Sequence, residues 1–388
     1  MYKTLKNFAI IKGIKKKTLY SWHERGSRIP LHFITSILGE DFYDYLDGYY
    51  FVSGTSNYKL KIHKAIDTSE AILLGWILSE GHLGEYKLVI SQKEKKPLQI
   101  LQKLCTYYYG DCGAKIYPEK NGFKLQLPQI FVAYFNLRFG IPLGKKSYNI
   151  RAPYQIMEAS DIIKYAFLTA YIEGDGTFSY FKTKYFKRPR IDITSCSKNF
   201  IEDCKILYSS LGYVARIYGG KTSEYKIGLY KSEDISKFYF YSYPFFIHEN
   251  KMRKFESYLQ QPYLLKTIFI DGKKITEDFR NKIGSWKEVS LALRNVGHAK
   301  SYLTIKNWQQ GWFKPNLATI IMMCDYLEAD YFKYVPKEHA GLLYLHNKIT
   351  FALFSQLKNN KVLLRDMNDG TEQLLMVKDV IKKLNPPL

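Results

Sequence analysis

The chain of 388 residues is poor in cysteine and has no long hydrophobic run. Its few cysteines form no CxxC pair and are odd in number, so we expect neither a disulfide framework nor a structural zinc site. No stretch reads as a transmembrane helix, and no apolar segment follows the N-terminus as in a signal peptide. We therefore expect an intracellular, cytoplasmic protein that does not enter membranes. The cysteines are Cys105, Cys112, Cys196, Cys204 and Cys324.

Acidic residues are also scarce, with 36 Asp and Glu against 58 Lys and Arg and a net charge of +22. The basic excess is spread along the chain, which favours a polyanionic partner. Nucleic acid is preferred over a membrane surface because no amphipathic anchor is present, and a nucleoid-associated location follows. The 34 tyrosines suit phosphate contact and base stacking, although most of these rings should lie in cores.

The stretch from Phe167 to Phe178 has the features of a helix that ends at a glycine. Ala170 and Gly174 are small residues four apart, so they share one helix face and allow another backbone to approach closely. Asp175 places a carboxylate at the negative end of the helix dipole, which costs a few tenths to ~1 kcal/mol. A bound cation would reverse the sign of that interaction.

The same pattern occurs earlier, from Leu73 to Gly81. Gly75 and Ser79 are the small pair there, and Glu80 is the terminal acid. The two acids are separated by about the length of one small domain. Two such helices packed through their small faces would bring Glu80 and Asp175 side by side.

Similar segments follow both helices. Each is followed by two strands, a helix, two more strands and a helix, and Asn121-Gly122 marks one hairpin turn. Two half-units sharing a helical interface make a pseudo-dimer within one chain. The sequence therefore predicts an α+β fold and a monomer whose pseudo-twofold symmetry is internal.

This pair of motifs resembles the LAGLIDADG family of homing endonucleases. The nine letters fall on Leu73 to Gly81 and on Leu168 to Gly176, and the second copy is the closer match. The resemblance covers residues 67–265, about half of the chain. It implies a pseudo-twofold pair of αββαββα repeats whose antiparallel sheets lie in the DNA major groove, with mostly α-helical flanking domains.

The expected domain boundaries follow from these patterns. We expect five parts: an N-terminal helix-turn-helix-like unit and linker at 1–66, a first repeat at 67–155, a second repeat at 156–265, a C-terminal helix-turn-helix-like unit at 266–336, and a tail at 337–388. The tail has no functional interpretation beyond packing; a strand, a turn at Asn368-Asp369-Gly370 and a terminal helix are expected there.

Alternating strands give each sheet one apolar and one polar, basic face. The basic face is either a solvated surface or a DNA-binding surface, and the run of like charges around residues 182–190 favours an anion. The candidate DNA-binding residues on the sheets are Lys87, Lys124, Lys182, Lys184, Arg188, Arg190 and Lys226.

Both flanks show a helix, a turn and a second helix, which is the plan of a helix-turn-helix. Thr18 to Trp22 and Thr304 to Trp308 align without gaps. A plain helical hairpin is the alternative, particularly for the N-terminal copy. The C-terminal copy resembles the phage-repressor type and has four candidate readers of base edges, which are Ser301, Lys306, Asn307 and Gln310.

Phosphodiester cleavage needs an activated water and neutralisation of charge on the phosphate and leaving oxygen. Divalent cations held by carboxylates supply these, so Glu80 and Asp175 are the predicted ligands of Mg²⁺, or of Mn²⁺. Family members also use lysines near each centre. The resemblance carries that role to Lys146, with Lys145 as substitute, and to Lys251.

The sequence thus predicts a site-specific, metal-dependent DNA endonuclease, a hydrolase that is free-standing or intron-encoded, with double-stranded DNA as its partner. Two alternatives stay open. One is a catalytically inactive LAGLIDADG-derived DNA-binding regulator, and the other is an RNA-binding maturase acting on intron RNA.

Overall fold

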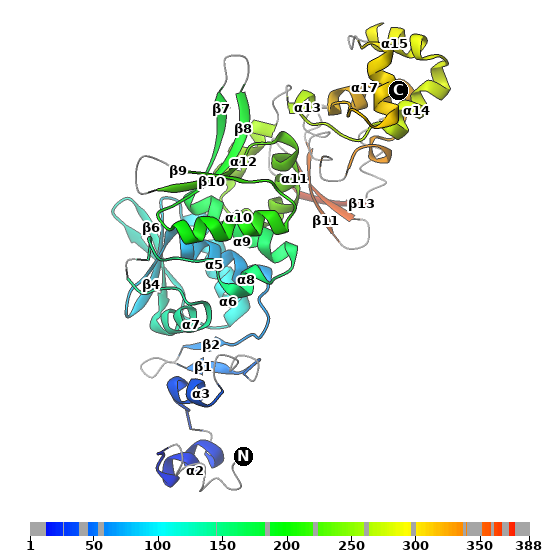
Figure 1. Cartoon of the computed structure of the whole chain (residues 1–388). Helices are drawn as coiled ribbons and strands as arrows, with labels where there is room; N and C mark the ends of the chain where they lie inside the picture. The colour runs from blue at the N-terminus through cyan, green and yellow to red at the C-terminus, as the bar shows by residue number, and fades with distance from the viewer. Residues whose placement is uncertain are drawn as a thin grey trace.

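The computed structural model describes residues 13–25, 27–38, 46–52, 58–144, 146–182, 187–219, 224–259, 264–295, 300–336, 339, 351–357, 361–366 and 372–376. Helices and antiparallel sheets alternate along the chain, so the predicted α+β class with helical flanks is confirmed (Figure 1). No helix within these ranges is long and apolar enough to cross a membrane.

The described residues of the N-terminal part include two helices and a small hairpin. Helices α2 (Lys16–Glu24) and α3 (Leu31–Leu38) are joined by an aromatic contact, with the Trp22 and Phe33 ring centroids 4.9 Å apart. Leu19 is buried, whereas Trp22 is partly buried. Strands β1 (Tyr50–Val52) and β2 (Lys59–Lys61) form an antiparallel pair.

Two seven-element repeats form the centre of the molecule. The first consists of α5 (Thr68–Glu80), β3 (Gly81–Leu83), β4 (Lys87–Gln92), α6 (Lys95–Tyr109), β5 (Lys115–Glu119), β6 (Gly122–Pro128) and α7 (Gln129–Phe139). The second consists of α9 (Asp161–Asp175), β7 (Gly176–Lys182), β8 (Lys187–Ser195), α10 (Lys198–Ser210), β9 (Arg216–Gly219), β10 (Tyr225–Leu229) and α11 (Ser232–Ser242). A short helix α8 (Tyr154–Met157) precedes the second repeat.

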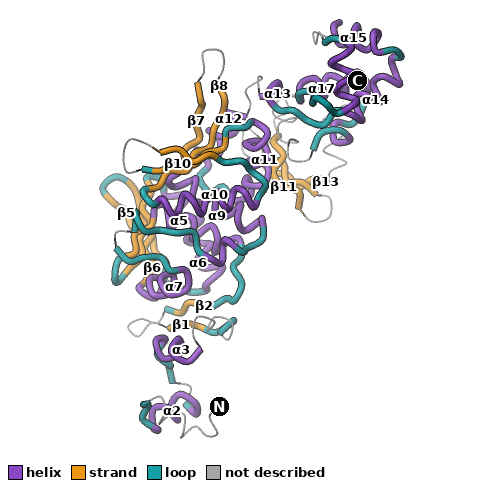
Figure 2. The backbone as a smooth tube through the Cα atoms, viewed as in Figure 1, coloured by secondary structure: helices purple, strands orange, loops and turns teal. Residues whose placement is uncertain are grey.

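The two sheets have the same topology. Their strand orders are β3-β4-β6-β5 and β7-β8-β10-β9, and every pairing is antiparallel. Both sheets lie along the same side of the central helices (Figure 2). Their apolar faces are buried at Leu88, Leu125, Ile191 and Ile227, because the helices of each repeat cover that side.

The second repeat is followed by a set of helices and 3₁₀ turns that precedes the tail. They are the 3₁₀ turn η2 (Tyr243–Phe245), α12 (Glu249–Leu259), α13 (Leu264–Thr267), α14 (Lys273–Ile283), α15 (Trp286–Asn295), α16 (Tyr302–Gln310), α17 (Leu317–Leu327) and the 3₁₀ turn η3 (Tyr331–Lys333). The N-terminal helices and the C-terminal helical unit lie at opposite ends of the view in Figure 1.

The tail forms a sheet with more strands than expected. Strands β11 (Phe351–Leu357), β12 (Lys361–Asp366) and β13 (Glu372–Met376) pair in that order, and β11 contacts α11. The sequence predicts one strand here, and the structure has three within the described residues. The difference arises because a short run forms a strand only where neighbouring strands supply pairing partners, which the local sequence does not show. The expected turn at 368–370 and the helix over 377–384 lie outside the described residues.

Candidate active site

The central seam between α5 and α9 is built from small residues. A Cβ added to Gly75 would lie 2.6 Å from both the Cβ of Ala170 and the carbonyl oxygen of Phe167. A Cβ added to Gly174 would lie 2.0 Å from the Ser79 hydroxyl oxygen. Backbones approach this closely only where side chains are minimal, so the small pairs allow the two helices to touch.

The close approach of the helices brings their two terminal acids together. Glu80 is the last residue of α5 and Asp175 the last of α9. A Cβ on Gly174 would meet the Glu80 Cγ at 3.0 Å, which shows how near this side chain comes to the end of α9. Partial desolvation and the neighbouring Glu80 charge raise the pKa of Asp175 to about 6. The like-charged carboxylates of Glu80 and Asp175 therefore lie close together at the ends of the two helices.

The first predicted lysine lies directly beside these acids. Lys146 is buried, and its ammonium group donates hydrogen bonds to the carbonyl oxygens of Ile77 and Leu78, the latter at 2.8 Å. Burial lowers the pKa of Lys146 to about 8, although the charges of Asp175 and Glu80 act in the opposite direction. Lys145 lies outside the described residues.

Lys251, which lies on α12, makes equivalent contacts with the last turn of α9. Its ammonium group donates to the carbonyl oxygens of Glu173 and Gly174, the latter at 3.2 Å. Burial lowers its pKa as well, against the charges of Glu80, Glu173 and Asp175. Leu78, Glu173 and Gly174 lie in the last turns of α5 and α9, where carbonyls lack intrahelical partners, so the lysines satisfy them. The Ile77 carbonyl also accepts the N–H of Gly81.

Each lysine is hydrogen-bonded to one central helix but interacts most strongly with the acid at the end of the other. Among the carboxylates that act on each lysine, Asp175 has the larger effect on Lys146 and Glu80 on Lys251. Lys146, however, is bonded to the helix that ends in Glu80, and Lys251 to the helix that ends in Asp175. Both repeats therefore contribute to each acid–lysine pair.

Glu173 belongs to this site although the motif pattern did not predict it. It is fully buried, and its carboxylate accepts hydrogen bonds from the backbone N–H groups of Ile247 at 3.0 Å and His248 at 2.6 Å. Desolvation raises the pKa of Glu173 to about 8. The sequence did contain a sign of this role. Glu173 is the sixth residue of the second motif copy, where the first copy has the apolar Leu78.

A hollow of about 300 Å³ opens beside Asp175. Its lining includes Lys146 from the first repeat, Thr194 and Cys196 from the end of β8, and Glu224 from the loop before β10. Asp175 is exposed toward solvent, whereas Lys146 is buried. An exposed acid beside a buried base leaves room for a phosphate group and water.

Two carboxylates at adjacent helix C-termini suit a hard divalent cation. Among the described residues, no group of three or more His, Cys, Asp and Glu side chains gathers as a closed metal cage. A two-carboxylate set fits Mg²⁺ because this ion retains several waters and takes only one or two protein carboxylates. Mn²⁺ accepts the same oxygen ligands.

Four predicted DNA contacts lie on the polar faces of the two sheets. Lys87 is exposed, and Lys124 forms an ion pair with Glu119 at 3.2 Å. Lys226 is partly buried, and Arg190 forms an ion pair with Asp192 at 2.7 Å. Acids on the same faces therefore already neutralise part of the charge.

The other predicted contacts on the sheets are less fully defined. Lys182 lies in β7 and Arg188 in β8, with their side chains outside the described part of the structure, and Lys184 lies outside the described residues.

The predicted reading helix of the C-terminal unit is α16. Ser301 caps it, and the Ser301 hydroxyl accepts a hydrogen bond from the Thr304 N–H at 3.2 Å. Lys306 and Gln310 are exposed one turn apart, and Asn307 is partly buried beside them. The opposite side of α16 packs into the unit through Ile305 and Trp308.

Residues 163–242 match the family model for a LAGLIDADG-like domain. The chain carries a LAGLIDADG-like domain. This match spans α9 to α11 and confirms the family resemblance for the second motif copy.

Solved structures similar to part of this chain include two endonucleases and one further LAGLIDADG domain. Homing endonuclease I-DmoI in complex with DNA and Mn is 19% identical, with a TM-score of 0.32, and covers 43% of this chain and 92% of its own. Meganuclease I-SmaMI bound to uncleaveable DNA is 14% identical, with a TM-score of 0.37, and covers 50% and 92%. The N-terminal LAGLIDADG domain of WhiA is 16% identical, with a TM-score of 0.31, and covers 45% and 80%.

Proposed function

We propose that this protein is a site-specific endonuclease that hydrolyses both strands of a DNA duplex with Mg²⁺ or Mn²⁺. One observation carries the proposal: Glu80 and Asp175 meet at two adjacent helix ends, and each has a buried or half-buried lysine beside it. Ordinary helix packing does not require acids there, because they oppose the helix dipoles and each other.

The reaction adds water across a phosphodiester. The water oxygen gives up a proton and bonds to phosphorus, one P–O ester bond breaks, and the departing oxygen takes up a proton. A divalent cation held by the carboxylates would lower the pKa of a nearby water and neutralise charge on the phosphate.

The chain's own groups have distinct roles in this proposal. Glu80 and Asp175 would hold the divalent cation, one carboxylate serving each strand. Lys146 and Lys251 are fixed by helix carbonyls, so their positive charges stay in place when the charge on phosphorus grows. Because the pKa of Lys146 lies at about 8, this residue can also give up or take a proton near neutral pH.

The duplex partner is supported by the polar sheet faces. An antiparallel two-stranded ribbon fits the major groove, and Lys87, Lys124, Arg190 and Lys226 lie on the strands of the two sheets. Two repeats in one chain supply both strand-cutting centres, so the protein acts as a monomer. The C-terminal helical unit extends the contact through α16.

A library of random duplexes incubated with the full chain and Mg²⁺ tests the proposal. We expect cleavage of a small subset of sequences, and Asp175→Asn should leave one strand uncut by reducing its rate at least a hundredfold, roughly the effect of losing a charge-stabilising group. Lys205→Ala, on the outer side of α10, is the matched control and should cleave normally.

Other outcomes would point to the alternatives. Tight duplex binding without cleavage, unchanged by Asp175→Asn and centred on the C-terminal unit, would favour a DNA-binding regulator. Preferential binding of structured intron RNA over any duplex would favour a maturase.

A further inference from the structure

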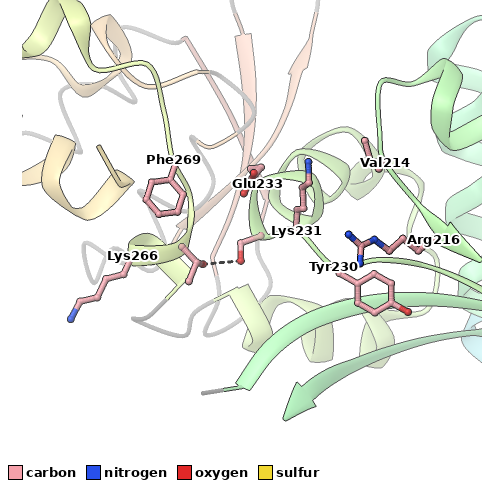
Figure 3. A pocket seen from close by; sticks show the side chains of 9 residues that line it. Val214, Arg216, Tyr230, Lys231, Glu233, Lys266 and Phe269 are labelled. Carbon is pink, nitrogen blue, oxygen red and sulfur yellow. Dashed lines mark hydrogen bonds between the residues drawn. The ribbon is translucent and has the colours of Figure 1, made fainter. Parts of the chain in front are cut away.

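A second hollow, of about 520 Å³, lies away from the acids, where the second repeat meets the chain leading to the C-terminal unit (Figure 3). Arg216 at the start of β9, Lys231 after β10 and Lys266 on α13 supply three basic side chains from three segments. Glu233 is the acid among its lining residues. The hollow is therefore strongly basic.

These basic groups are available to bind a ligand. Arg216, Lys231 and Lys266 are all exposed, and none forms an ion pair within the described part of the chain. The nearby Asp234 has a pKa raised by burial, which the charge of Lys231 opposes. Exposed cations around one hollow interact favourably with an anion that enters it.

The hollow continues the polar face of the second sheet. Arg216 lies opposite Gly228 in the pairing of β9 with β10, and Gly228 lies opposite Asp192 of β8. Residues two apart on a strand share a face, so Arg216 lies on the same face as Lys226 and Arg190. β9 is an edge strand, and the basic hollow begins at this edge.

The other wall of the hollow leads to the C-terminal unit. Thr267 donates a hydrogen bond to the Ser232 hydroxyl at 2.7 Å, which ties α13 to the start of α11. Residues 268–270 then pair with that unit: the Leu317 N–H donates to the Ile268 carbonyl at 2.8 Å, and the Ile270 N–H to the Pro315 carbonyl at 3.1 Å. The hollow thus lies on the physical connection between the sheet and α17.

We propose that this hollow binds the phosphate backbone of the duplex as it leaves the second sheet toward the C-terminal unit, which rests on the proposed endonuclease function. The walls are open: Phe269 is 52% and Val214 61% exposed. An open basic track with an apolar wall fits a passing sugar-phosphate strand, whereas a small phosphorylated ligand is enclosed on most sides.

The test removes the three charges together in the full chain, as Arg216→Gln, Lys231→Gln and Lys266→Gln. The matched control is Lys103→Gln, Lys198→Gln and Lys205→Gln, three exposed lysines on α6 and α10, the helices that cover the opposite faces of the sheets. Binding is measured by anisotropy over a range of salt on a duplex selected by the wild type, with Ca²⁺ present. A nuclease footprint is recorded for each protein.

The expected result is a slope of log K against log salt that is smaller by about 2 to 3, since each phosphate contact contributes roughly 0.9. The footprint should also shorten at one end only, while the control keeps the wild-type slope and footprint. The cleavage positions should not move.

Two results would overturn the inference. One is a triple variant with the wild-type slope and footprint. The other is unchanged duplex binding together with loss of inorganic phosphate binding, which would make the hollow a small-anion site. If the wild type itself binds and cuts no duplex, the proposed function fails instead, so the two failures are distinguishable.

Discussion

At the scale of single residues, the seam concentrates charges that are costly without a ligand. Asp175 has a pKa of about 6 instead of its ordinary 3.8, because of partial desolvation and the Glu80 charge. Lys146 has a pKa of about 8 instead of 10.5, because of burial. Perturbed groups of opposite sign at one point are typical of functional sites.

The stability of the metal-free protein should depend on pH through Asp175. Its folded-state pKa is raised, so the stabilising contribution of the protonated form is complete below about 3.8 and is lost as pH rises through about 6. Asp175→Asn should therefore unfold at a higher temperature than the wild type in EDTA at pH 7.5. The gain should be about 1 kcal/mol after allowance for solvent exposure, and it should vanish at pH 4. Equal melting temperatures at pH 7.5 would contradict this expectation.

Glu173 should position Lys251 and, through it, one cutting centre. Glu173→Leu, which copies Leu78 of the first repeat, removes the acceptor for the Ile247 and His248 N–H groups. We expect cleavage of one strand to slow by roughly tenfold to a hundredfold, so that nicked duplex accumulates. Glu173→Gln should retain near wild-type rates because its carbonyl oxygen can accept both hydrogen bonds. Equal slowing of both strands, or a Gln variant as slow as Leu, would indicate a purely structural role.

At the scale of elements, the contact between α5 and α9 depends on residues without bulk. Glycine inside a helix normally costs about 1 kcal/mol relative to alanine. Gly75 is retained within α5 where an added Cβ would lie 2.6 Å from the Phe167 carbonyl oxygen. Close packing here outweighs helix propensity.

Gly75→Ala should accordingly destabilise the protein despite the better helix propensity of alanine. The loss in the free energy of unfolding should be about 1–3 kcal/mol, since the neighbouring backbone must shift. Gly219→Ala is the control, because an added Cβ there meets no atom within 4 Å, and its effect should stay within roughly 0.5 kcal/mol. Urea unfolding of both variants gives the comparison, and a more stable Gly75→Ala would refute the close approach of the two helices.

At the scale of the whole molecule, a pseudo-symmetric core is joined to flanks that are not symmetric. The core places equal sheets beside the paired acids, while the helical units stand at its two ends. Cleavage position and overall affinity should therefore be separable.

Lys306→Ala with Gln310→Ala should weaken duplex binding by about 1–3 kcal/mol for each side chain that reads a base edge, yet leave the cleaved bonds unchanged. Footprinting and mapping of the cut ends check both statements. Lys274→Ala on α14 is the control and should leave the affinity unchanged. A shift of the cleaved bonds in the double variant would show that α16, rather than the sheets, sets the register.

Much of the site could be predicted from the sequence because its signals are local. Small residues four apart, a terminal acid and a following glycine lie within one helix, and strand alternation lies within one strand. Those patterns placed Glu80 and Asp175 at helix ends and Lys87, Lys124, Arg190 and Lys226 on strands, as the structure has them. Their roles in metal and DNA binding stay predictions.

Tertiary structure alone decided the contacts between distant segments. The hydrogen bonds of Glu173 to residues 247 and 248, the crosswise matching of Lys146 and Lys251 to the acids, and the basic hollow at Arg216 each join segments far apart in the chain. The sequence determined which groups each helix and strand presents, because side-chain direction follows the period of the element. Only the packing of α9 against α5, together with the hydrogen bonds from Ile247, His248 and Lys251 to the end of α9, determined which of the active-site groups meet, because desolvation and charge interaction act through space.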